Sequence, residues 1–312
     1  MVKTSIEKKE RAQGPLFRAE NLLLADCLSS PSELYSHVSS HQDLPGQRTI
    51  FAALDEVGRG CVAGPVVVCA SLWVAGFPQP SFRSWSAAIR DSKKMSEAQR
   101  EKTFADGIGG GHFVSQPHWD EPPSAKESLP ALKLAQQMRE LSRPHRVSAF
   151  TAQQLNALLQ NQTQASGTCE FILSGVFIGS VNATEIDRFG IVPSLGLAAS
   201  RALEQIQQEL MPSVLFFDGH RPLSLVPRWN TTPQILVTKG DDILKSISIS
   251  SVIAKVVRDR WMVRYGLEYP RYDFASHRGY GTEKHQKALN EHGLTQLHRR
   301  SFLKNICPES PR

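Results

Sequence analysis

The sequence lacks any long hydrophobic run. No segment approaches the ~20 consecutive apolar residues that a membrane-spanning helix needs. The first residues also lack an extended apolar core followed by the small residues that mark a secretory cleavage site. We therefore expect neither membrane insertion nor secretion. No internal repeat is visible in the sequence either.

Paired cysteines are missing too. The chain has five scattered cysteines, and no two of them form a C-x-x-C pair. This odd number and spacing exclude a disulfide framework and a typical zinc site. We expect reduced thiols in a cytoplasmic protein. The cysteines are Cys27, Cys61, Cys69, Cys169 and Cys307.

What the chain does contain is typical of an ordinary globular protein. Its 312 residues are 40% hydrophobic and 21% charged, which is enough for one large domain or for one domain with an appendage. The formal net charge of +6 is a modest basic excess. That excess fits a nucleic-acid partner without requiring one.

The character of the sequence changes along the chain. Residues 1–47 are charged and then rich in Ser and His, with one short apolar island, and indicate an N-terminal extension that is partly disordered or helical. Residues 48–305 form the predicted main domain. A stretch at about 107–172, rich in Gly and Pro, is typical of an insertion or lid within it. Residues 306–312 form a C-terminal tail.

The apolar patterns predict an α/β fold with a mixed central sheet flanked by helices. Runs of β-branched and apolar residues predict strands at 49–54, 62–74, 213–217 and 234–238. Helical periodicity and capping residues predict helices at 96–106, 131–141, 184–210 and 247–265. For the helix at 184–210, Thr184 is the predicted cap.

Carboxylates stand at the ends of three predicted strands. Asp55 and Glu56 follow the first, Asp218 follows 213–217, and Asp241 follows 234–238. One edge of an α/β sheet can gather such side chains, and an all-oxygen ligand set suits Mg²⁺ or Mn²⁺ rather than zinc. Two such ions about 4 Å apart can hydrolyse a phosphodiester. Taken singly, Asp218 and Asp241 are more typical of turns or helix caps, whereas the adjacent pair is not.

Three further motifs could contact nucleic acid. Glycines permit positive φ and a close approach of the backbone to a ligand, basic side chains can bind phosphate, and a tyrosine between glycines can stack on a sugar or base. Taken alone, a three-residue G-R-G occurs often by chance, and a pair of lysines is by default part of a solvated surface. A tyrosine between glycines is more often a packing anchor. The residues are Gly58, Arg59 and Gly60, Lys93 and Lys94, and Tyr280.

Seven segments together resemble the type 2 ribonucleases H, and among them the ribonuclease HII family. They occur in the family's order and cover most of residues 50–104 and 178–302. The first and the fifth are specific on their own. The segments are DEVGRGCVAGPVVVCA, DSKKMSEAQR, ATEIDRFGI, VLFFDGH, VTKGDDILKSISISSVIAKVVRDRWM, YDFASHRGYGTEKHQKAL and HRRSF.

The resemblance implies a ribonuclease H-like fold and a monomeric endonuclease of DNA replication and repair. Its substrates would be RNA/DNA hybrids and duplex DNA with embedded ribonucleotides, cut on the 5′ side of the ribonucleotide to leave 5′-phosphate and 3′-hydroxyl ends. Two Mg²⁺ or Mn²⁺ ions would be held by Asp55, Glu56, Asp218 and Asp241. The backbone of Gly58, Arg59 and Gly60 would recognise the ribose 2′-hydroxyl, and Tyr280 would pack on the sugar of the following deoxynucleotide.

The chain departs from the family pattern at three places, and two alternatives stay open. Gly190 replaces an Asn, residues 248–251 read SISS rather than AAAS, and Arg278 replaces a Lys. The sister family ribonuclease HIII is one alternative, although it lacks the GRG and Gly-Tyr motifs. A catalytically inactive nucleic-acid-binding protein is the other. Against it, four intact acids would repel phosphate and weaken simple binding.

Overall fold

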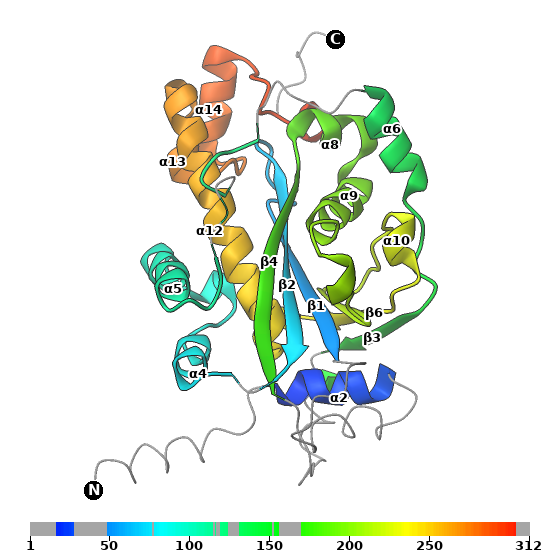
Figure 1. The fold of residues 1–312 in the computed structure, drawn as a ribbon. Helices are drawn as coiled ribbons and strands as arrows, with labels where there is room; N and C mark the ends of the chain where they lie inside the picture. The colour runs from blue at the N-terminus through cyan, green and yellow to red at the C-terminus, as the bar shows by residue number, and fades with distance from the viewer. Residues whose placement is uncertain are drawn as a thin grey trace, which may run out of the picture.

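The computed structural model describes residues 17–27, 49–76, 78–114, 116, 119–123, 131–151, 153–155 and 170–303. Its centre is a six-stranded mixed sheet with the strand order β3-β6-β5-β1-β2-β4, and helices cover both faces (Figure 1). The predicted α/β architecture is therefore confirmed. The strands are β1 (Ile50–Val57), β2 (Val66–Ala75), β3 (Val147–Thr151), β4 (Phe171–Val181), β5 (Val214–Asp218) and β6 (Gln234–Thr238).

Pairing within the sheet divides it into two halves. Strands β1, β2 and β4 form an antiparallel meander, while β1, β5, β6 and β3 are parallel neighbours. Alternate residues of β1 face different cores: Phe51 and Ala53 contact one, and Ala52 and Leu54 contact the other. Because both faces are covered, the strand reads as a continuous apolar run.

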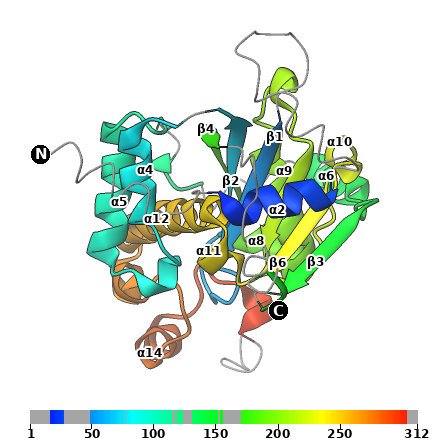
Figure 2. The ribbon, with the colours of Figure 1, turned by 90° about the horizontal axis from the view of Figure 1, so that it is seen from below.

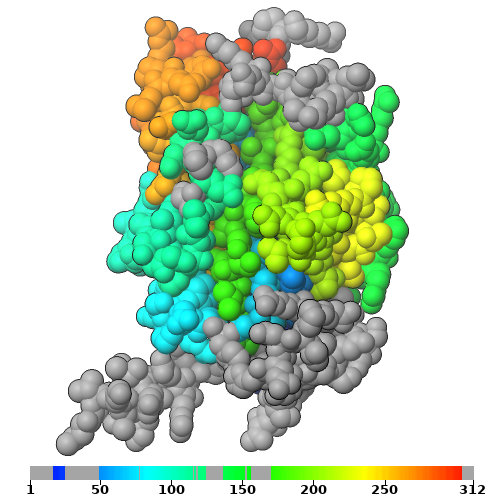
Figure 3. Space-filling model, viewed as in Figure 1, coloured from blue at the N-terminus to red at the C-terminus, as the bar shows by residue number. Residues whose placement is uncertain are grey.

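The helices form a layer on each face. The long helix α12 contacts β1 and β2 and belongs to one core, whereas α9 packs on β2 and β4 in the other core. Between these layers the edge strand β4 reaches the surface (Figure 3). The helices are α2 (Arg18–Cys27), α4 (Pro80–Ala87), α5 (Glu97–Gly109), α6 (Ala131–Glu140), α8 (Ala183–Phe189), α9 (Ile191–Leu203), α10 (Pro227–Asn230), α11 (Gly240–Ile243), α12 (Lys245–Glu268), α13 (Phe274–His277) and α14 (Glu283–His292). Short 3₁₀ turns cover Ser92–Lys94, Gln208–Leu210, Pro270–Tyr272 and Arg300–Phe302.

Helix α2 joins the N-terminal extension to the core. It lies across the end of the sheet (Figure 2), and the buried Phe17 ring packs edge-on against Trp73 and Phe171, with centroids 5.2 and 5.5 Å away. The buried Glu20 carboxylate accepts hydrogen bonds from the Ser246 N–H and hydroxyl at 3.0 and 2.9 Å. Glu20 thus satisfies a free donor at the start of α12. The apolar island of the extension is a helix that belongs to the packed domain.

The single helix predicted at 184–210 was wrong. Two helices, α8 and α9, meet at Gly190, whose φ of +82° favours glycine. The predicted cap was also wrong, because Asn182 caps α8 in a reciprocal capping box with Glu185. In contrast, Ser96 caps α5 as expected, in a capping box with Gln99.

The region 107–172 contributes to the sheet, which its sequence did not reveal. Strand β3 pairs in parallel with β6 at the edge of the sheet, and α6 confirms the predicted helix at 131–141. Elsewhere in this region Trp119 is buried, and its carbonyl accepts a 2.8 Å hydrogen bond from the Trp261 indole of α12. In these described parts β3 is hydrogen-bonded to the sheet and Trp119 to α12. Residues 306–312 and most of 1–47 lie outside the described residues, so the domain limits stay predictions.

Candidate active site

The sheet gathers the four predicted acids at one edge. Asp55 and Glu56 directly precede Val57, the last residue of β1, and pair with β2. They therefore lie within the strand rather than after it as expected. Asp218 ends the neighbouring strand β5. Asp241 lies in α11, just after β6, beyond a left-handed turn at Lys239 with φ 60°. Parallel neighbours therefore present their carboxyl ends together.

Burial and mutual repulsion dominate the electrostatics of this cluster. Burial raises the pKa of Asp55 well above its usual range, and the negative charges of Glu56, Asp218 and Asp241 raise it further. Burial, followed by the Asp218 charge, raises the pKa of Asp241 to about 6. Carboxylates held this close without a counter-ion disfavour their own ionisation. The cluster is thus prepared for a positively charged ligand.

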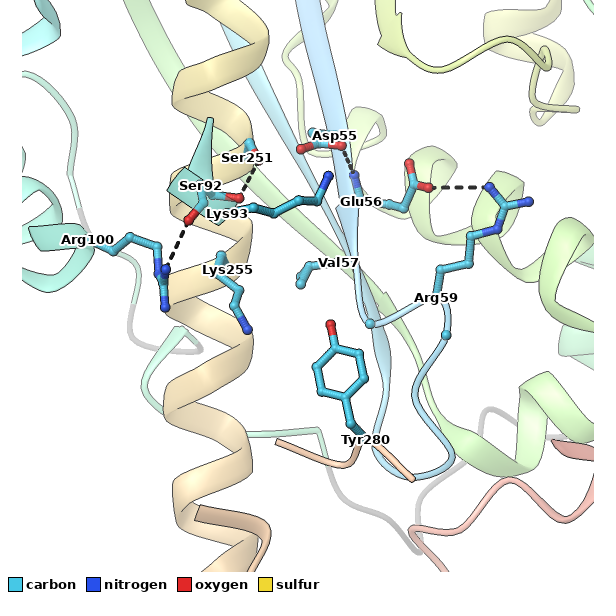
Figure 4. Close-up of a pocket in the computed structure, with 12 residues that line it drawn as sticks. Asp55, Glu56, Val57, Arg59, Ser92, Lys93, Arg100, Ser251, Lys255 and Tyr280 are labelled. Atoms are coloured by element: carbon cyan, nitrogen blue, oxygen red, sulfur yellow. Dashed lines mark hydrogen bonds and ion pairs between the residues drawn. The ribbon is translucent and has the colours of Figure 1, made fainter. Parts of the chain in front are cut away.

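The donor chemistry fits Mg²⁺ or Mn²⁺, although the side chains do not converge on one point. Asp241 is 3% exposed, and its Oδ2 has no hydrogen-bond donor among the described residues, the Lys93 ammonium lying 3.5 Å away. The Glu56 carboxylate turns toward Arg59 at 3.6 Å (Figure 4). Within the described part of the chain, no three His, Cys, Asp or Glu side chains form a ready ion site. A buried oxygen without a donor is nevertheless what a cation ligand requires.

A pocket of about 270 Å³ lies beside the acids. It brings together most of the predicted substrate-binding residues, with Tyr280 next to the GRG segment and Lys93 extending from the opposite side (Figure 4). Lys94 does not line it, because its ammonium pairs with Asp242 at 2.5 Å. The predicted residues that line the pocket are Asp55, Glu56, Gly58, Arg59, Gly60, Lys93 and Tyr280.

Four further polar residues line the pocket, and the sequence analysis did not single them out. Ser251 and Lys255 are one turn apart on α12 and so share a face, a signal that the sequence contained. Ser92 lies in the 3₁₀ turn before α5, and Arg100 lies within α5. The hydroxyls of Ser92 and Ser251 lie 2.9 Å apart, and the Arg100 guanidinium donates to the Ser92 carbonyl at 2.9 Å.

The serines that replace the usual alanines connect α12 to the acid-bearing segments. The Ser248 hydroxyl donates to the Asp241 carbonyl at 2.6 Å. The Ser250 hydroxyl donates to the carbonyl of Ala53, two residues before Asp55, at 2.9 Å. Each buried hydroxyl is therefore satisfied, and the departure from the family pattern creates hydrogen bonds that alanine could not make.

Asp241→Asn should make the metal-free protein more stable at neutral pH, by about 1–2 kcal/mol above pH 7. The folded-state pKa of about 6 lies above the usual value of 3.8, so the folded state holds a proton that the unfolded state releases. The stabilisation that protonated Asp241 gives the folded wild type is thus lost as pH rises through 6. Urea denaturation in EDTA should show the excess stability of the variant shrinking between pH 6 and pH 4. An excess independent of pH would contradict the raised pKa.

Comparisons with known proteins show the family and the fold. A family model described as Ribonuclease HII matches residues 52–305. A ribonuclease HII of Trichormus variabilis is 30% identical over 254 residues, 81% of each chain, and one of Polaromonas sp. is 44% identical over 127 residues, 40% of this chain and 59% of that relative.

A solved structure shares the fold. The ribonuclease H2 of Pyrococcus horikoshii is 19% identical, covers 82% of this chain and 96% of its own, and superposes with a TM-score of 0.50. In the described residues no helix is long and apolar enough to cross a membrane. With a family model spanning most of its length and a relative aligned over four-fifths of both sequences, the chain belongs to the ribonuclease HII family of ribonuclease H endonucleases.

Proposed function

We propose that the protein cleaves the RNA strand of RNA/DNA hybrids and nicks duplex DNA on the 5′ side of embedded ribonucleotides. The reaction is a two-metal-ion phosphodiester hydrolysis that leaves 5′-phosphate and 3′-hydroxyl ends. The observation that carries this proposal is the buried cluster of acids directly beside a pocket lined by the GRG segment and Tyr280. Acids that can hold metal ions, next to residues that can contact the ribose, favour cleavage of the phosphodiester beside a ribonucleotide.

The four acids, Asp55, Glu56, Asp218 and Asp241, would hold the Mg²⁺ or Mn²⁺ ions. Bound there, the ions supply an activated water and stabilise the leaving oxygen. The Gly240 N–H donates to one Asp218 oxygen at 2.7 Å and fixes its orientation. Lys93 in the pocket would contact phosphate. For Lys94 we propose no such contact, because Asp242 already holds its ammonium.

The other half of the pocket would read the sugar. Gly58 has φ +87°, a conformation that leaves its backbone accessible without a side chain. Its segment would hydrogen-bond the ribose 2′-hydroxyl, the group that distinguishes RNA from DNA. The Tyr280 side chain, in a residue that is 45% exposed, would pack on the sugar of the next deoxynucleotide. The two contacts together would recognise an RNA-to-DNA junction.

The test is cleavage of an end-labelled DNA duplex that contains one ribonucleotide, with Mg²⁺, Mn²⁺ or EDTA, resolved to single nucleotides. We expect a metal-dependent nick on the 5′ side of the ribonucleotide. Cleavage of a long RNA/DNA hybrid without that nick would favour an activity like that of ribonuclease HIII. Failure to cut either substrate would favour a binding protein.

Tyr280→Ala should impair nicking at a single ribonucleotide more than cleavage of a long hybrid. The stacked sugar contact that is lost is worth about 1–3 kcal/mol, and a long hybrid offers many sites that do not depend on a junction. Tyr280→Phe keeps the ring and serves as the control. Comparing kcat/KM on the two substrates measures the effect, and equal losses on both would refute a junction reader.

A further inference from the structure

Two arginines are completely buried behind the pocket. Arg258 on α12 and Arg299 near the C-terminus are each 0% exposed. Among the described residues neither forms an ion pair with a carboxylate, and Nη2 of Arg299 has no hydrogen-bond acceptor. Burying a charge without a counter-charge is costly. Because burying these two charges is unfavourable for folding, we expect a functional role for the two arginines.

Within the described part of the chain, both guanidinium groups donate to main-chain carbonyls alone. Arg258 donates to Pro65, Arg278 and Ala63 at 2.9, 2.9 and 3.1 Å. Arg299 donates to Gly64 and Arg59 at 3.0 and 3.1 Å. These carbonyls belong to two loops, residues 58–65 and 278–280, that carry the proposed readers of ribose and sugar.

The two loops also bind each other directly. The N–H groups of Val62 and Ala63 donate to the Gly279 carbonyl at 2.9 and 3.2 Å, and the Arg299 N–H donates to the Val62 carbonyl at 2.8 Å. A Cβ on Gly279 would lie 2.4 Å from the Ala63 oxygen. The loops are therefore in main-chain contact, with the arginines bridging them from behind.

The GRG segment closes tightly over the Arg258 side chain. A Cβ on Gly58 would lie 2.2 Å from Nε of Arg258. Gly58 thus makes room for the arginine on one side while its backbone lies at the pocket on the other. Burial, together with the charge of Arg258, lowers the pKa of Arg299 to about 9. At neutral pH this still leaves two positive charges behind the loop that would receive a phosphodiester.

We propose that Arg258 and Arg299 are positioning residues that lock the GRG segment and the Tyr280 loop into one rigid reader of the ribose. Five charge-assisted hydrogen bonds hold the carbonyls of both loops, so the N–H groups that face the substrate are fixed before it binds. The two buried charges add a positive potential beneath the phosphodiester. This inference rests on the proposed function, because it concerns the same reading of the 2′-hydroxyl.

The experiment measures binding in EDTA, so that no cleavage occurs. Fluorescence anisotropy gives the Kd for a DNA duplex with one ribonucleotide and for the same duplex made only of DNA. The Kd for the all-DNA duplex divided by the Kd for the ribonucleotide duplex is the ratio that reports ribose recognition, whereas a general loss of structure or charge weakens both affinities alike. Arg299→Met and Arg258→Lys should each lower the ratio by about tenfold, the effect of losing hydrogen bonds to a charged group.

The matched control is Arg201→Met. Arg201 is a partly buried arginine of α9, in the layer on the opposite face of the sheet, held by Glu185 at 2.8 Å, and its loss should leave the ratio unchanged. A wild type without any preference for the ribonucleotide would overturn the proposed ribose reading itself. A wild type with that preference, and folded arginine variants that keep it within twofold, would overturn the positioning role. If Arg299→Met does not fold, Arg299→Lys decides in the same way.

Discussion

Asp55→Asn should reduce the rate of cleavage by about a thousandfold or more, roughly 4 kcal/mol in the activation barrier. Asparagine keeps the size of the side chain and one oxygen but removes the negative charge at the centre of the acid cluster. Bound metal would then lose the charge of one ligand. Single-turnover cleavage of the one-ribonucleotide duplex measures the loss directly.

Folding of this variant should be intact. Because the Asp55 carboxylate is repelled by three neighbouring acids, its neutral replacement should not lower the midpoint of thermal unfolding in EDTA at pH 7.5. The control is Asp242→Asn, which changes the neighbouring acid that pairs with Lys94 and should keep activity within about threefold. Activity of Asp55→Asn close to that of the wild type would refute the ligand assignment.

Gly58→Ala should destabilise the protein by about 2–5 kcal/mol. Its φ of +87° is unfavourable for any residue with a Cβ, which costs about 1–2 kcal/mol. The new methyl group would also lie 2.2 Å from the buried Arg258 side chain, and displacing a well-packed group costs a further ~1–3 kcal/mol. Equilibrium denaturation in urea measures the total. Cleavage should fall as well, because the displaced arginine no longer holds the loop.

Gly60→Ala, two residues away, is the control. No described atom lies within 4 Å of the position that its Cβ would take, and its φ is not positive. Stability should therefore remain unchanged or rise slightly, since alanine lowers the entropy of the unfolded chain. Similar destabilisation by both substitutions would show that the loop is intolerant in general and that Arg258 is not the cause.

The acidic residues of the site were predictable where they stand at the ends of strands. Asp55, Glu56 and Asp218 terminate short apolar runs, and such runs in an α/β chain become buried parallel neighbours whose carboxyl ends meet. The gathering of these acids could therefore be predicted before any coordinates were considered. Strand β3 could not, because it is an exposed edge strand of five residues whose weak alternation is indistinguishable from a loop.

The buried arginines were unpredictable for a different reason. Arg258 occupies an otherwise apolar face of α12, and an isolated arginine in a helical pattern usually extends its charge to solvent. Arg258 can be buried because main-chain carbonyls of two loops far away in the sequence accept its hydrogen bonds, and the helical pattern gives no sign of them. Lys93 and Lys94 were also indistinguishable in sequence, yet a short 3₁₀ turn directs one toward Asp241 and the other toward Asp242.

The docking of helix α2 has a consequence for biosynthesis. Glu20 and Ser246 are 226 residues apart in the chain, so the helix leaves the ribosome long before its partner on α12 exists. At a synthesis rate of about 5–20 residues per second this wait lasts roughly 10–45 s. Throughout that time Phe17, Leu23 and Leu24, which are buried in the finished molecule, have no completed core to enter. Closure of the domain is therefore a late event of translation, and the nascent chain must keep an apolar segment from aggregating until α12 emerges.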